Sequence, residues 1–151
     1  MWERLRRFNA LPRPAKALFL RACFLLPVLT LSLRLRGFGP TQKTLQKLIP
    51  ASIASLPDLA AQSVVALTSR MVLAASRHSF IQSTCLERSL ALWWLLARKG
   101  IASQLRIGVR KDSGKFQAHA WVEQEGNAIG EPDSVHLHYA AFSKEFSGDA
   151  S

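Results

Sequence analysis

The chain has 151 residues and a formal net charge of +10 at pH 7. This length fits one domain with its own hydrophobic core, which excludes a small fold that depends on disulfides or a structural metal. Its two cysteines, Cys23 and Cys85, are too few for a disulfide framework and indicate a reduced, intracellular protein.

The positive charge is concentrated in the first third of the chain. Residues 1–50 carry ten Lys and Arg against one acid, Glu3, whereas residues 51–151 carry ten against nine. A basic region of this kind attracts nucleic acid, anionic lipid or an acidic peptide, and charge alone does not choose among these partners.

The most apolar segment, residues 17–33, contains Arg21 and Pro27, and its longest uncharged stretch is the 12 residues 22–33. A membrane-spanning helix needs about 20 apolar residues. No small-residue cleavage site follows, as a secretory signal would require. We therefore expect a core or amphipathic helix interrupted at Pro27, with attachment to a membrane surface as the alternative.

Apolar residues recur at helical spacing through most of the first hundred positions. Helices are expected over residues 1–12, 15–35 with the interruption at Pro27, 41–48 with Thr41 as cap, 59–77 with Asp58 as cap, and 85–99. Gly37, Gly39 and Pro40 predict a break, residues 50–57 a linker, and Gly100 a helix stop.

After Gly100 the apolar residues recur at every second position, which indicates strands. Strands are expected over residues 101–109, 116–123 and 128–131, with turns at residues 111–114 and at Gly126. Helices followed by antiparallel strands predict an α+β fold. We expect one compact domain, with a basic helical region (1–57) packed on a core formed by residues 58–151.

The stretch STCLERS places Cys85 at the start of a predicted helix. Thr84 and Glu87 have the spacing of a capping box. The unpaired N–H groups and the positive dipole end of a first helical turn favour a thiolate, and they can hold an oxyanion during acyl transfer. The alternative is that Cys85 is inert packing, as most single cysteines are.

A nucleophilic cysteine needs a base, and His119 is the best candidate. It lies in the predicted strand FQAHAWVE, on a polar and aromatic face that it shares with Gln117, Trp121 and Glu123. The opposite face carries the apolar side chains Phe116, Ala118, Ala120 and Val122. His78 is expected in a loop. His136 and His138 form a weak metal pair, because no Cys or acidic partner lies at ligand spacing, and we expect no zinc site.

The base also needs an orienting group. A three-residue loop, 124–126, would place Trp121 opposite Ile129 and His119 opposite Glu131 on one side of the sheet. A register shifted by two residues would bring Asp133 opposite His119 instead. The alternative for Glu131 is a solvated hairpin acid.

The run CLERSLALWWLLARKGIASQLRIGVRK, followed by FQAHAWVE and a glycine turn, resembles the transglutaminase-like leader peptidases of lasso-peptide biosynthesis. The resemblance implies a papain- or transglutaminase-like fold and a cysteine peptidase that cuts a ribosomally made precursor between leader and core. By match to the motif, Cys85 is the nucleophile and His119 the base. The third member is usually Asp; Glu131 stands in its place here, with Asp133 as the fallback.

The resemblance also implies partners. These are the precursor peptide, a small leader-recognition protein and an ATP-dependent, asparagine-synthetase-like cyclase that forms the macrolactam. Because the chain shows no recognition domain of its own, we expect the split type of peptidase. No cofactor, metal or nucleic acid is expected, and the expected location is the cytoplasm or the inner face of the membrane.

Two other functions compete with the leader peptidase. One is a non-catalytic module that binds a peptide or a membrane through the basic first third. The other is a transglutaminase-like acyl transferase with a different substrate.

Overall fold

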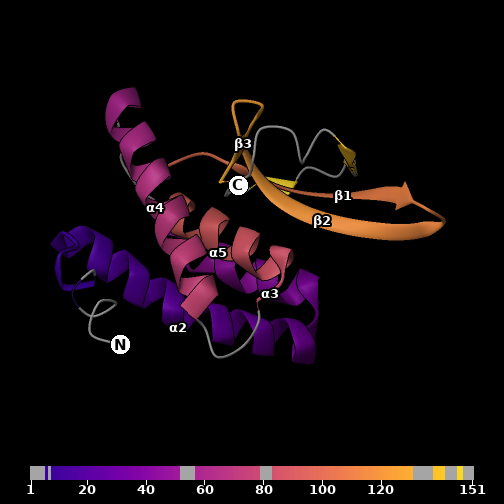
Figure 1. The fold of residues 1–151 in the computed structure, drawn as a ribbon, viewed down its shortest axis with the longest axis horizontal. Coiled ribbons are helices and arrows are strands. Elements are labelled where there is room, and N and C mark those ends of the chain that lie inside the picture. Colours follow the sequence, from indigo (N-terminus) through magenta and orange to yellow (C-terminus); the bar gives the residue numbers. More distant parts are fainter. Residues whose placement is uncertain are drawn as a thin grey trace.

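The computed structural model describes residues 6, 8–51, 57–78, 83–130, 138–141 and 146–147. Figure 1 shows helices packed beside a small antiparallel sheet, which confirms the predicted α+β class. The elements are α2 (Arg13–Arg36), α3 (Phe38–Lys47), α4 (Asp58–His78), α5 (Cys85–Ala97), β1 (Gln104–Asp112), β2 (Lys115–Gln124), β3 (Asn127–Ile129), β4 (Ala140–Ala141) and β5 (Phe146–Ser147).

The helix α2 runs through Pro27 without a break, so the predicted interruption is wrong. A proline inside a helix removes one backbone hydrogen bond and costs about 3 kcal/mol. Leu25, Leu26 and Leu29 are buried on both sides of it. Full burial of one such side chain contributes about 1.5–3 kcal/mol, so packing outweighs the local cost. Of the predicted helix over residues 1–12, residues 1–5 and 7 lie outside the described residues, and residues 6, 8 and 9 are helical.

The break between the first two helices is shorter than predicted. Only Gly37 separates α2 from α3, and its φ of 78° lies in the region that favours glycine. Pro40 falls in the first turn of α3, where its missing N–H has no intrahelical acceptor in any case. Thr41, predicted as the cap, lies inside α3, where its Oγ1 donates to the Gly37 carbonyl at 2.7 Å.

The helix α4 begins at Asp58, one residue earlier than predicted, so Asp58 is part of the helix instead of its cap. Its carboxylate still lies in the first turn, where negative charge is favourable. By length and composition, α2 and α4 are each apolar enough to cross a membrane, a test that core helices of soluble proteins and signal sequences also pass.

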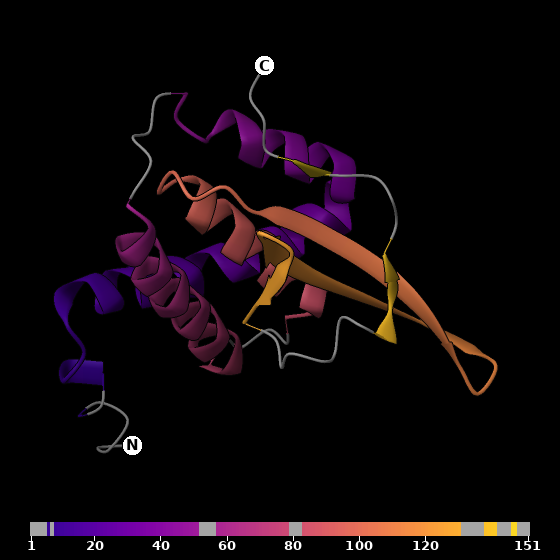
Figure 2. The same cartoon turned by 90° about the horizontal axis from the view of Figure 1, so that it is seen from above.

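The sheet has the order β3-β2-β1-β4, and β5 also pairs with β1. The β1–β2 hairpin turns at Ser113 and Gly114, and its tip extends beyond the helices (Figure 2). The next hairpin turns at Glu125 and Gly126, whose φ values are 50° and 79°. Positive φ at both positions identifies a two-residue type I′ turn, so the predicted three-residue loop is wrong.

One main core joins the helices to the sheet. Leu26 of α2, Leu90 and Trp93 of α5, Leu105 of β1 and Val122 of β2 are all fully buried in it. The short helix α5 contacts α2, α4 and the sheet, and it lies near the centre of the molecule (Figure 1). Its orientation is therefore fixed by packing on several sides.

Candidate active site

Cys85 is the first residue of α5, and the predicted capping box around it is confirmed. The Glu87 N–H donates to Thr84 Oγ1 at 3.4 Å, and the Glu87 carboxylate accepts from the Thr84 N–H. The N–H groups of Cys85 and Leu86 take no part in the box and have no acceptor within the helix. They are therefore available to a negatively charged atom beside the half-buried Cys85 side chain.

One buried hydrogen bond fixes this helix start against the sheet. Ser89 Oγ donates to the Ala120 carbonyl at 2.8 Å. Ser89 lies one helical turn after Cys85, and Ala120 is the neighbour of His119 along β2. The bond therefore places the candidate nucleophile and the candidate base on adjoining segments.

The described residues include no hydrogen bond between Cys85 Sγ and the His119 ring. Catalytic hydrogen bonds are commonly long in a free enzyme and shorten when substrate binds.

His119 is half-buried and lies between aromatic groups from two segments. Its ring centroid lies 6.0 Å from that of Trp121, with an angle of 18° between the two ring planes. The centroid of the Tyr139 ring lies 5.1 Å away. The Arg110 guanidinium lies 5.1 Å from the Tyr139 ring. These contacts restrict the imidazole, and Tyr139 was not predicted as part of the site.

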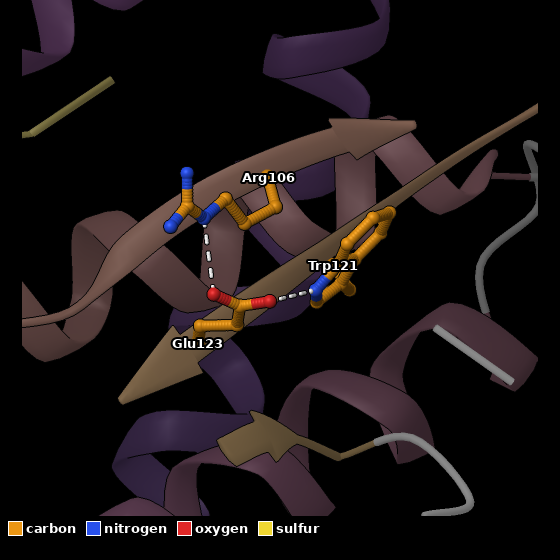
Figure 3. Close-up of polar contacts among 3 residues, drawn as sticks. All are labelled: Arg106, Trp121 and Glu123. Carbon is orange, nitrogen blue, oxygen red and sulfur yellow. Dashed lines mark hydrogen bonds and ion pairs between the residues drawn. The ribbon is translucent and has the colours of Figure 1, made fainter. Parts of the chain in front are cut away.

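Trp121 is held by a polar chain that crosses to the neighbouring strand (Figure 3). Its indole Nε1 donates to Glu123 Oε1 at 2.8 Å, and Arg106 Nε donates to Glu123 Oε2 at 3.0 Å. Arg106 lies opposite Trp121 in the β1–β2 register, so all three groups share one face. Glu123 thus anchors the ring that stacks on His119.

A glycine makes room for this arrangement. Gly108 pairs with His119 across the β1–β2 ladder. A Cβ at Gly108 would lie 2.9 Å from Trp121 Cη2 and 3.0 Å from the Ala140 carbonyl oxygen. Only a residue without a side chain fits beneath the indole, which explains why Trp121 is just 2% exposed on the face predicted to be polar.

The predicted register of the second hairpin is wrong by one residue. Val122, and not Trp121, pairs with Ile129. A one-residue shift moves every side chain of a strand to the other face, so the argument that placed Glu131 opposite His119 no longer holds. Glu131 and Asp133 lie outside the described residues, and the identity of the third member stays a prediction.

The other histidines have separate surroundings. His78 ends α4, where its Nδ1 lies 2.8 Å from the Ala74 carbonyl and its ring meets Phe19 edge-on. His138 is exposed, and His136 lies outside the described residues. In the described part of the chain, no three His, Cys, Asp or Glu side chains are grouped to bind a metal.

Cys23 differs from Cys85 in its setting. It lies within α2 and packs against the main core. Burial raises the pKa of the Cys23 thiol above its ordinary value, because the thiolate loses solvation. This agrees with a structural role and leaves Cys85 as the cysteine at a helix start.

Comparisons with known proteins give one match. A family model described as the transglutaminase-like superfamily matches residues 25–144. No curated protein matches the chain, and no solved structure does. The match spans the second half of α2, the helices α3 to α5 and the strands β1 to β4, including the strand that carries His119. The chain belongs to the transglutaminase-like superfamily.

Proposed function

We propose that the protein is a cysteine peptidase that removes the leader from a lasso-peptide precursor. In this proposal it acts with a leader-recognition protein and an asparagine-synthetase-like cyclase. The observation that carries the catalytic part is the capped helix start at Cys85, tied by Ser89 to the strand segment of His119. Membership of a superfamily that includes cysteine peptidases and acyl transferases supports it further.

The reaction begins when the Cys85 thiolate attacks the carbonyl carbon of the scissile peptide bond. The N–H groups of Cys85 and Leu86 stabilise the oxyanion, because they point away from the helix without an intrahelical acceptor. The tetrahedral intermediate collapses as the C–N bond breaks and His119 gives a proton to the leaving amine. The core peptide departs with a free N-terminus.

The leader then remains on Cys85 as a thioester. His119 takes a proton from water, which attacks the thioester carbon and releases the leader with a free carboxylate. The C–S bond breaks as Cys85 leaves as a thiolate, and His119 keeps the proton taken from water, so the pair returns to its starting state without an oxidant or cofactor. The aromatic contacts of His119 with Trp121 and Tyr139 limit the ring orientations available for these two transfers.

The orienting acid is proposed from the family pattern alone, with Glu131 first and Asp133 second. Comparison of Glu131→Gln with Asp133→Asn tests the choice. The variant that lowers kcat most identifies the residue that orients His119. An unchanged rate in both variants would show that neither acid orients His119.

The decisive test is precursor cleavage by the full chain with both partner proteins present. We expect Cys85→Ala to abolish release of the leader and Cys23→Ala to retain it, since Cys23 packs against the core. Cleavage that survives in Cys85→Ala would overturn the peptidase proposal. Circular dichroism of both variants confirms that they are folded.

An acyl transferase would share every step up to the thioester. The two activities separate when a nucleophilic amine is added and the leader product is weighed by mass spectrometry. A hydrolase yields the free carboxylate even at high amine concentration, whereas a transferase yields the amide. If the amide is the main product, the protein is an acyl transferase and the peptidase proposal is wrong.

A further inference from the structure

A groove of about 760 Å³ opens between α2, α3 and the C-terminal end of α5. Its lining is mainly apolar and includes Leu20, Phe24 and Val28 of α2, Leu48 at the end of α3, and Trp94 of α5. Trp94 is nine positions beyond Cys85 along α5, which corresponds to about 14 Å of helix. The groove is therefore separate from the candidate active site.

Four of these side chains are exposed instead of being packed in the core. Leu20, Phe24 and Val28 are 57%, 77% and 46% exposed, and they recur at every fourth residue. Leu48 adds a further side chain at 57%. Apolar residues gathered along a concave surface indicate a binding site, whereas scattered ones are ordinary.

The wall formed by α5 is fixed before anything binds. The Trp94 indole Nε1 donates to the Leu45 carbonyl at 3.0 Å, which ties α5 to α3. The Arg98 guanidinium lies 4.9 Å from the Trp94 ring centroid, in cation–π geometry. A partner would thus meet a preformed surface and would lose little binding energy to ordering it.

The rim of the groove is basic. Arg21, Arg36, Arg98 and Lys99 line it, and none of its described lining residues is acidic. Residues 8–51, which include α2 and α3, contain seven Lys and Arg and no Asp or Glu. An occupant with acidic groups beside its apolar ones would complement this rim, and it would be attracted at long range.

We propose that this groove docks an amphipathic helix of another protein, with an apolar stripe bordered by Asp and Glu. The concave shape favours inserted side chains over the flat face of a bilayer. The spacing of Leu20, Phe24 and Val28 along α2 matches the spacing of apolar anchors on a docked helix. The inference does not depend on the proposed peptidase activity, because binding is measured without cleavage.

The test uses the full chain and a fluorescent synthetic helix with a leucine stripe bordered by Glu. Fluorescence anisotropy should show saturable binding that weakens as salt is added. A matched peptide with Lys in place of Glu should not bind. Equal binding of the two peptides, or no binding of the acidic one, would overturn the proposal.

Variants locate the site. We expect Phe24→Gln to weaken binding about tenfold, as loss of a central aromatic anchor does. Phe116→Gln, at 76% exposure on the hairpin, is the matched control and should bind normally. Arg36→Glu should also weaken binding, whereas Arg77→Glu, at the corresponding end of α4, should not. Equal effects of each variant and its control would contradict the assignment.

Two other occupants give different results. Phosphatidylglycerol-containing vesicles that bind the chain through Phe24, while the acidic peptide fails, would replace the helix with a lipid surface. Sedimentation that shows a dimer dissociated by Phe24→Gln would replace it with a second copy of this chain. Either result overturns the proposal of an acidic partner helix.

Discussion

Ser89 Oγ and the Ala120 carbonyl oxygen form a buried hydrogen bond of 2.8 Å that joins α5 to β2. Each partner lies close to one candidate catalytic residue, since Ser89 follows Cys85 by one turn and Ala120 follows His119 directly. The main core holds the rest of α5 against the sheet. The bond is thus the polar contact that sets the position of the helix start along β2.

Ser89→Ala should lower both stability and activity. Loss of a buried hydrogen bond should reduce the free energy of unfolding by about 1–2 kcal/mol. Because small misplacements of a nucleophile are costly, we expect kcat for precursor cleavage to fall about tenfold or more. Urea unfolding and cleavage assays measure the two effects.

Ser76→Ala is the control for this variant. Its hydroxyl bonds within α4 on the exposed surface, so both quantities should stay unchanged. A Ser89→Ala variant that loses stability but keeps its kcat would show that the bond does not position Cys85.

Glu123 should act on catalysis through Trp121. Glu123→Gln retains an oxygen for the indole N–H and loses the Arg106 ion pair, which is partly exposed and worth about 1 kcal/mol or less. Glu123→Ala removes both contacts, including the hydrogen bond that orients the ring stacked on His119. We expect the Ala variant to lower kcat with little change in KM, and the Gln variant to retain most of kcat.

Steady-state kinetics on the two variants separates positioning from simple destabilisation. Glu125→Gln, in the exposed hairpin turn, removes the same charge and should leave kcat unchanged. Equal kcat values for Glu123→Ala and Glu123→Gln would show that the hydrogen bond to Trp121 does not help to orient His119.

The helices and strands were largely predictable, because their apolar spacing reflects which face is buried. The α5 helix, its capping box and the α+β class follow from patterns within a few residues. The continuation of α2 through Pro27 was not predictable, since it depends on packing by residues far along the chain. Tertiary contacts outweighed a local preference there.

The site was predictable only in part for a similar reason. Cys85 and His119 lie in recognisable local patterns, and their elements adjoin in the structure. The hairpin register depends on a single turn residue, and the type I′ turn at Glu125 shifted it by one. Ser89, Arg106 and Tyr139 were missed because their roles depend on cross-strand or helix–sheet contacts that no local spacing reveals.

Gly108→Ala should destabilise the face that carries His119. The new Cβ would approach Trp121 Cη2 to 2.9 Å and the Ala140 carbonyl to 3.0 Å, so the buried indole or β4 must move. Overpacking of this kind costs about 1–3 kcal/mol. Gly39→Ala in α3 is the control, because nothing lies within 4 Å of its added Cβ, and a helical Gly→Ala change stabilises. Thermal unfolding of the two variants should therefore show opposite shifts; equal shifts would exclude a close fit at Gly108.

Burial should slow the alkylation of Cys23 in the folded protein. Burial raises the pKa of the Cys23 thiol, so at neutral pH its reactive thiolate fraction is smaller in the folded protein than in the unfolded chain. We expect iodoacetamide to modify Cys23 more slowly in the native state than in urea, with a native rate that rises as pH approaches the raised pKa. Peptide mass spectrometry measures the modified fraction of Cys23 in both states. A native Cys23 rate equal to that in urea would show that the thiol is not desolvated.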